Sequence, residues 1–430
     1  MRAMKDSGIE WIGQIPQEWG VCKIKNCFNV FAGATPKSGN SEFWDGDIVW
    51  VTPADYTTEQ KYISKGRKNI TREGFESCST EMIPAGSLIF SKRAPIGLTA
   101  INTVELCTNQ GCLSCVPLDE NDVEYFYYAF GCFSEQFDLY GSGTTFKEIS
   151  ADAFVNFSIP CPVPETQRKI SEYLRNRCAE IDALIAAKEK TNALLKERRQ
   201  SIIYEAVTKG LNSDVPMKDS GIEWIGEIPE SWAVGKLGYF IEVFNGDRSS
   251  NYPSGSDIQE SGVPFLTSSN LEYDVLDMSS SKYISEEKYE SMSGLKMELN
   301  DIIYCLRGSV GKCSINKTET CGTVASSLMG IRCKKMEPEF LLFVLKSPVI
   351  ETQNALFMNG TCAANLSAEN VCGYLVPIPA KAEQTAIAEY LQDRCTEMDE
   401  LISANEATIQ KLKEYRQSII YEAVTGKIEI

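Results

Sequence analysis

The decapeptide "RQSIIYEAVT" stands at Arg199–Thr208 and again, unchanged, at Arg416–Thr425. Each copy closes a segment, 165–208 or 382–425, that contains no proline and no glycine. A segment of about 44 residues would extend roughly 66 Å as one α-helix, at 1.5 Å per residue. That length exceeds what a lone helix of a globular domain reaches. The sequence therefore predicts two long helical domains, which we place at 165–210 and 382–425.

Apolar residues recur every seven positions along both segments, which is typical of helices that pair as a coiled coil. One polar residue interrupts each series near its middle, Lys188 in the first and Asn405 in the second. Two like seams in one chain most simply bury each other, and related units usually meet about a two-fold axis. We therefore expect an antiparallel pair, with Lys188 and Asn405 close together as a polar layer. The apolar seam positions are Leu174, Ile181, Leu195 and Ile202 in the first helix, with Ile170 and Leu184 on the same stripe, and Leu391, Met398, Leu412 and Ile419 in the second, with Ile387 and Leu401 beside them.

A second repeat precedes each half of the chain. "MKDSGIEWIG" occupies Met4–Gly13 and Met217–Gly226. We interpret this segment as a dock that attaches each half to the common helices. Large aromatic side chains favour packing over ligand contact in such a role. The proposed packing anchors are Trp11 and Trp19 in the first copy and Trp224 and Trp232 in the second.

Between the dock and the helix, each half contains a body whose two copies match only weakly. Short alternating runs such as "GSLIFS" and "NDIIYCLRG", separated by Gly, Pro, Asn and Asp, predict strands. Helices are expected at 123–137 and 338–357. The predicted fold class is α+β. Two mixed α/β domains, 1–160 and 217–379, are separated by two long antiparallel helices that form a coiled coil, as an internal repeat with pseudo-two-fold symmetry.

Composition excludes several kinds of chemistry. The chain has no histidine, so Cys/His zinc sites and imidazole general bases are excluded. Its 16 cysteines are scattered, and we interpret them as buried apolar residues, with no metal site expected. No apolar run is long enough to span a membrane, and no secretion signal is visible, so we expect a cytoplasmic protein without a membrane partner. The net charge of −17 argues against tight DNA binding by the isolated chain.

The order of these segments, and its repetition, resembles the specificity subunit of type I restriction-modification enzymes. The resemblance covers essentially the whole chain and rests on "KDSGIEWIGQIPQEW", "GDIVWVTPADY", "FSKRAPIGLTAI", "CTNQGCLSCVP", "GSGTTFKEIS" and "IPCPVPETQRKISEYL". It implies that each body is a target recognition domain reading one half of a bipartite, asymmetric site on double-stranded DNA.

The resemblance also implies partners and cofactors. Two methyltransferase subunits, which modify adenine at N6 with S-adenosylmethionine, would dock on the helices. Motor and endonuclease subunits, which use ATP and Mg²⁺, would join the full complex. The chain itself would be a non-catalytic specificity subunit without a cofactor of its own.

Candidate DNA contacts come from basic residues and from polar loop residues. Cations supply the sequence-independent part of DNA affinity, and polar side chains read base edges. For the basic run 61–72 the alternative is a solvated loop, and for Arg93 and Arg307, which match between the bodies, it is an internal ion pair. The candidates are Lys61, Lys65, Arg67, Lys68, Arg72, Lys92, Arg93, Asn109, Gln110, Lys282, Arg307 and Lys312, with Thr52, Asp55, Asn245, Ser268 and Asn270 as further polar residues that ordinary turns would also explain.

Two other functions stay open at this point. "DLYGSGTTF", Asp138–Phe146, resembles a glycine-rich S-adenosylmethionine loop, which would make the chain a stand-alone DNA methyltransferase. Its counterpart "LFMNGTCAA" lacks the pattern, and no N-P-P-F or D-P-P-Y tetrapeptide is present to hold a target amine. The third possibility is a coiled-coil scaffold that binds only proteins. The basic run weakens that possibility.

Overall fold

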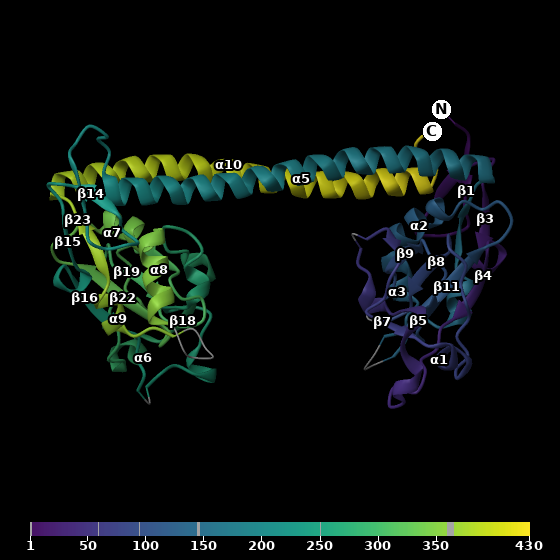
Figure 1. The fold of residues 1–430 in the computed structure, drawn as a ribbon, viewed down its shortest axis with the longest axis horizontal. Coiled ribbons are helices and arrows are strands. Elements are labelled where there is room, and N and C mark those ends of the chain that lie inside the picture. Colours follow the sequence, from purple (N-terminus) through teal and green to yellow (C-terminus); the bar gives the residue numbers. More distant parts are fainter. Residues whose placement is uncertain (1, 59, 94, 144–146, 250, 359–364) are drawn as a thin grey trace. The chain divides into compact units, whose positions relative to one another are not determined.

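The computed structural model describes residues 2–430 except 59, 94, 144–146, 250 and 359–364 (Figure 1). The chain divides into two compact units. Unit 1 comprises residues 1–188 and 407–430, and unit 2 comprises residues 189–406. Each unit therefore contains one body and one half of each long helix. In the part of the chain that the structure describes, no helix is both long and apolar enough to cross a membrane.

The two long helices are α5, Pro164–Lys209, and α10, Lys381–Val424. They confirm the two helices predicted from the absence of interior proline and glycine. Proline fits the first turn of α5 because the N–H that it lacks has no partner there. Both helices end before a glycine with positive φ, Gly210 at +76° and Gly426 at +69°. Glycine adopts this left-handed conformation without steric cost, so it closes the helix.

The body of unit 1 contains two sheets. A five-stranded sheet has the order β4-β11-β8-β9-β6, and a three-stranded sheet has the order β10-β5-β7. Buried rings from α2, α3 and α4 cover the larger sheet, for example Phe130, Phe137 and Phe154 around Phe90 of β8. The elements are β4 Phe28–Ala32, β5 Trp44–Val51, β6 Tyr62–Ile63, β7 Lys68–Ile70, α1 Arg72–Glu76, β8 Leu88–Ser91, β9 Thr99–Asn102, β10 Cys107–Thr108, β11 Cys112–Pro117, α2 Val123–Cys132, α3 Ser134–Leu139 and α4 Ala151–Val155.

The body of unit 2 repeats this plan with fewer strands in the larger sheet. Its sheets have the orders β16-β22-β19-β20 and β18-β17-β21. The elements are β16 Ile241–Asn245, β17 Val263–Leu266, β18 Lys282–Ile284, α6 Glu286–Ser291, β19 Ile302–Cys305, β20 Cys313–Ile315, β21 Thr323–Val324, β22 Leu328–Cys333, α7 Pro338–Leu345, α8 Pro348–Phe357 and α9 Ala368–Cys372. The segments 123–137 and 338–357, each expected to be helical, contain two short helices apiece.

The repeated dock folds in the same way in both units. A hairpin, β1–β2 in unit 1 and β13–β14 in unit 2, is followed by a strand that pairs with the strand just before a long helix, β3 with β12 and β15 with β23. The bounds are β1 Met4–Asp6, β2 Gln14–Pro16, β3 Gly20–Lys23, β12 Ser158–Cys161, β13 Met217–Asp219, β14 Glu227–Pro229, β15 Ala233–Lys236 and β23 Leu375–Ile378. Each dock thus connects its body to the start of a long helix.

The tryptophans anchor the docks, as predicted. Trp19 and Trp232 are buried in the cores of their units, and Trp11 and Trp224 pack against the same cores. The indole N–H of Trp232 also donates to Glu383 of α10 at 2.8 Å. Burial of the whole ring with the helix residues explains why the dock sequence is kept in both halves.

Inside unit 2 the two long helices run antiparallel. Asn192 of α5 contacts Asn405 of α10, and Arg199 of α5 contacts Asp399 of α10. Residue numbers therefore rise along one helix where they fall along the other. Asn405 donates to Asn192 at 2.8 Å, and both side chains are buried. Asn405 thus lies in a buried polar layer, and its hydrogen-bond partner there is Asn192. The expected contact between Asn405 and Lys188, which lies one helical turn from Asn192 on α5, stays a prediction.

Candidate nucleic-acid interface

The basic run 61–72 spans β6, β7 and the start of α1. Figure 1 shows β7 and α1 at the end of this body that lies away from the long helices of the same unit. Four of its cations are exposed: Lys65, Arg67, Lys68 and Arg72. Arg67 remains 75% exposed although its guanidinium donates to the Ala54 carbonyl and lies 3.6 Å from Asp55. Exposed cations at one end of a body are suited to contact phosphates without base selection.

Lys61, the first cation of the run, lies inside the body. Its ammonium is 3.1 Å from Glu124 of α2, and both side chains are 18% exposed. Glu124 also accepts from Tyr62 at 2.6 Å and from Arg175 of α5 at 2.7 Å. Burial alone would raise the pKa of Glu124, but the hydrogen bonds from Tyr62, Arg175 and Lys61 outweigh it and lower the pKa. Lys61 therefore has a structural partner, and it holds the basic run against α2 and α5.

Arg93 and Arg307 occupy equivalent places, since each forms an isolated β-bridge, with Glu148 and with Asn365 respectively. In unit 1, Glu148 lies 2.8 Å from Lys92 and 3.8 Å from Arg93. In unit 2 the partner is neutral, because Arg307 donates to the amide oxygen of Asn365 at 3.0 Å. The internal ion pair considered for this arginine is thus present in one body, whereas Arg307 forms no ion pair with any residue outside the undescribed positions such as 359–364.

The remaining cationic candidates lie on the second body. Lys282 is exposed on β18 and forms no ion pair with any residue that the structure describes. Lys312 forms an exposed ion pair with Glu272 at 2.7 Å. An exposed pair of this kind is weak, so the ammonium of Lys312 can exchange its partner for a phosphate at little cost.

Most polar loop candidates have turn roles. The carboxylate of Asp55 accepts from the backbone and hydroxyl of Thr52, which closes a capping box. In a second capping box the amide oxygen of Asn270 accepts from the backbone N–H of Thr267 at 2.8 Å, and the Asn270 side chain is fully buried. Asn109 accepts from the backbone N–H of Gly111 at 2.9 Å. These side chains shape the loops.

Gln110 and Ser268 are placed differently. The exposed Gln110 accepts from the hydroxyl of Thr35, and Ser268 lies half-buried within the capped turn of Thr267. Gln110 is thus the more accessible of the two to a base edge.

A hollow of about 300 Å³ lies at the end of β16 in the second body. Its lining includes Asn245 and Arg248, both exposed. Beneath them the buried carboxylate of Asp247 accepts from the N–H groups of Ser249 at 2.6 Å and Ser293 at 2.8 Å. These hydrogen bonds lower the pKa of Asp247 to about 2. Asp247 thus ties its own turn to Ser293, and the amide of Asn245 and the guanidinium of Arg248 are of the kind that recognise adenine and guanine edges.

The segment that resembles a cofactor loop gives no support to a methyltransferase fold. Asp138, its first residue, forms an ion pair with Lys147. Residues 144–146 lie outside the described residues.

Comparison with known proteins decides the family. The sequence profile of the type I restriction modification DNA specificity domain matches residues 16–196 and again residues 229–413. The chain is 30% identical to the MjaIX specificity subunit of Methanocaldococcus jannaschii, over 97% of this chain and 95% of the relative. This chain belongs to the type I restriction-modification DNA specificity family. Another relative, the EcoBI specificity subunit of Escherichia coli, is 23% identical over 80% of this chain and 76% of its own length.

Solved structures share the fold. One chain, from a structure that addresses the assembly and conformational transition of a type I restriction-modification system, superposes with a TM-score of 0.73. It is 16% identical, with 96% of this chain and 99% of that chain covered. The HsdS subunit of Thermoanaerobacter tengcongensis gives a TM-score of 0.52 at 16% identity, covering 96% and 98%. The resemblance and the fold class inferred from the sequence are confirmed.

The sequence of this specificity-family chain did not predict two features of the interface. One is Arg248, and the other is the contact of Glu124 with Lys61, Tyr62 and Arg175. Arg248 stands in a short stretch with turn character, "NGDRSS", and a lone arginine there gives no signal. Glu124 belongs to a helix and Arg175 to another, and only the fold brings them to the basic run. The individual DNA contacts remain predictions.

Proposed function

We propose that this chain is the DNA sequence-specificity subunit of a type I restriction-modification complex. Each body reads one half of a bipartite, asymmetric site on double-stranded DNA. Two adenine-N6 methyltransferase subunits dock on the helices, and motor and endonuclease subunits join the full complex. The chain is a non-catalytic adaptor, so S-adenosylmethionine, ATP and Mg²⁺ belong to the partner subunits.

The two bodies share a fold but carry different surface residues, which supports the reading of two different half-sites. Equivalent positions carry different chemistry in the two bodies: Glu148 beside Arg93, but Asn365 beside Arg307. The exposed guanidinium of Arg248 in the second body stands near the end of β16, and the exposed lysines 65 and 68 lie on the first. Base edges are distinguished by the donor and acceptor pattern of such groups, so bodies with different groups select different bases.

Matched surfaces on the helices support two equivalent partners, and this observation carries the proposal of paired docking. Leu184 of α5 and Leu401 of α10 are separated by 217 residues, the offset of the helical repeat. Both were expected on the buried seam, but that expectation is wrong, because each is 55% exposed. Each follows an exposed i,i+3 ion pair. These pairs are Arg177–Glu180, at 2.8 Å, and Arg394–Glu397, at 3.1 Å. A tyrosine precedes each pair, Tyr173 and Tyr390.

The repeat of this surface has a simple consequence. Tyrosine and arginine are enriched at protein–protein interfaces, and the surface on each helix aligns both with an exposed leucine along one helix face. Two copies of this surface offer equal binding sites to two copies of one partner. We name these two surfaces stripe 1, on α5, and stripe 2, on α10. Stripe 1 consists of Tyr173, Arg177, Glu180 and Leu184, and stripe 2 consists of Tyr390, Arg394, Glu397 and Leu401.

The test counts partner subunits on the full chain. Native mass spectrometry of the chain with the methyltransferase subunit of its own system should show two bound subunits. Leu184→Glu and Leu401→Glu should each leave one, and the double variant none. Leu194→Glu is the matched control, because Leu194 is also 55% exposed but its counterpart on α10 is Lys411. Retention of two subunits by the double variant, or loss in the control, would contradict the assignment.

A further inference from the structure

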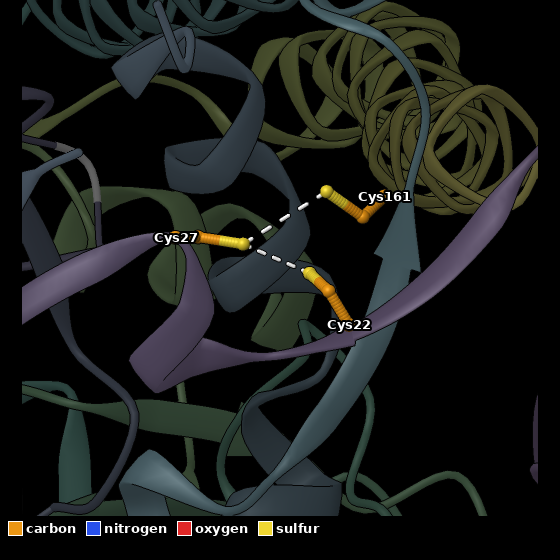
Figure 2. Close-up of side chains that lie close together, drawn as sticks. All are labelled: Cys22, Cys27 and Cys161. Atoms are coloured by element: carbon orange, nitrogen blue, oxygen red, sulfur yellow. Dashed lines mark hydrogen bonds between the residues drawn. The ribbon is translucent and has the colours of Figure 1, made fainter. Parts of the chain in front are cut away.

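Three cysteines from two separate segments of the sequence meet where the first body joins α5. Cys22 lies on β3, Cys27 directly follows the 3-10 helix Ile24–Asn26, and Cys161 ends β12. The Sγ atoms of Cys22 and Cys27 are 2.8 Å apart, and those of Cys27 and Cys161 are 3.8 Å apart. Figure 2 shows the three side chains converging on one point. All three sulfurs lie within 4.8 Å of one another.

The fold holds these cysteines in place without their thiols. The pairing of β3 with β12 sets Cys22 opposite Ile159. The carbonyl of Cys27 accepts from the backbone N–H of Leu118 at 2.8 Å. Because backbone bonds fix two of the three positions, the sulfurs are presented together whether or not they bind anything.

The second body shows that packing alone does not require sulfur here. Gly235, Phe240 and Ile378 occupy the equivalent positions, at the offsets of 213 and 217 residues that relate the two halves. They also meet one another: a Cβ on Gly235 would lie 3.2 Å from the Phe240 ring and 3.6 Å from Ile378. The same place in the frame is therefore filled by a ring and an aliphatic side chain in one body and by three thiols in the other.

A hydrogen-bond donor lies beside one of the three sulfurs. The buried amide of Gln167 donates to Cys161 Sγ at 3.8 Å. An N–H group aimed at a sulfur is the outer-shell contact that stabilises a metal thiolate.

We propose that Cys22, Cys27 and Cys161 bind one thiophilic d¹⁰ cation such as Zn²⁺. Thiolates 2.3 Å from a tetrahedral zinc lie about 3.8 Å apart, which the Cys27–Cys161 pair already satisfies, and Cys22 must move away from Cys27 by about 1 Å. Starting from three thiols, binding forms three S–Zn bonds and releases three protons. The partly exposed Cys22 and Cys161 leave the fourth position to water. The ion would fasten β3 to β12, which connects the first body to α5.

The test uses the full reduced chain and Zn²⁺ or Co²⁺ alone. Competition with a chromophoric chelator should give one tight equivalent, and Co²⁺ should show thiolate charge-transfer and tetrahedral d–d absorption. The variant Cys22→Gly/Cys27→Phe/Cys161→Ile carries the residues of the second body, so it tests the site with a combination that packs there. It should weaken binding by about 100-fold or more, since loss of an outer-shell partner alone costs 10–100-fold.

A second variant controls for the other thiols. Cys132, Cys333 and Cys372 are also partly buried, and replacing all three by alanine should leave the tight equivalent unchanged. Zn²⁺ should raise the thermal midpoint of the wild-type chain and of this control, but not of the first variant. Equal binding by the first variant, loss of binding in the control, or a Cys22–Cys27 disulfide that persists in reductant would each overturn the proposal.

Discussion

Arg93 and Arg307 hold the same position in the two bodies but meet side chains of different charge. Glu148 partly neutralises Arg93 and Lys92, whereas among the described residues the side chain of Arg307 meets the neutral amide of Asn365. A cation that is already paired releases less free energy when it reaches a phosphate, because its first partner must be given up. The two arginines therefore differ in how much they can contribute to DNA affinity.

This difference can be measured as a salt dependence. In the methyltransferase-loaded complex, Arg307→Ala should weaken DNA binding for all sequences and reduce the slope of log K against log salt by about one. Arg93→Ala, its matched control in the other body, should reduce the slope less. An unchanged slope for Arg307→Ala would remove Arg307 from the phosphate contacts.

Glu124 is a second residue whose surroundings decide its role. Its pKa is lowered in the folded chain, so its contribution to stability is present above the unfolded pKa, near 4.5, and is lost as the pH falls through the folded value. Glu124→Gln should lower the free energy of unfolding by about 2 kcal/mol at pH 7, the scale of hydrogen bonds to a charged group. The difference from the wild type should shrink below about pH 4.

Urea unfolding at pH 7 and at pH 3.5, followed by circular dichroism, measures both values. Glu120→Gln is the control, because Glu120 is 80% exposed and forms only a surface pair with Arg168. Its effect should stay small at either pH. A Glu124→Gln penalty that persists at low pH would show that packing, and not charge, holds the basic run.

At the scale of the elements, the long helices were the most predictable part of the chain. A segment without proline or glycine and with a seven-residue apolar repeat leaves few alternatives to a paired helix. The partners within the polar layer were less predictable, since Asn405 hydrogen-bonds to Asn192, a residue that the heptad pattern does not single out. Asn192 lies one helical turn from Lys188, and side-chain packing between the helices decides which residues meet.

The buried Asn192–Asn405 pair is expected to lower the stability of the helix pair while it fixes the register between the two helices. Replacing both residues by leucine should raise the thermal midpoint, by roughly 2–4 °C for each kcal/mol gained, because a polar layer specifies register at a cost in stability. Hydrogen exchange at the helix centre should become heterogeneous as the register loosens. Lys190→Leu, at an exposed position of the same stretch of α5, should change neither property. A lower midpoint for the double variant would contradict this view.

At the scale of the whole molecule, the sequence revealed the repeat but not the sites. Contacts that join distant segments were beyond it: Cys22 and Cys161 meet only because β3 pairs with β12, and Glu124 reaches Lys61 only through α2. Asp55 and Asn270 have the turn roles that were the alternative for polar loop residues, because both hydrogen-bond to the local backbone. Composition and periodicity therefore predict the helices and the internal repeat, whereas a binding site depends on residues that only the tertiary fold brings together.

The central claim is that each body selects one half of a divided DNA site. Sequencing of N6-methyladenine in cells that express the complex, with the wild-type chain and with Arg248→Ala, tests it most directly. The wild type should give one asymmetric motif of two specified parts with a fixed unspecified spacer, and Arg248→Ala should relax one part while the other stays unchanged. A continuous motif, or a change in both parts, would contradict the account.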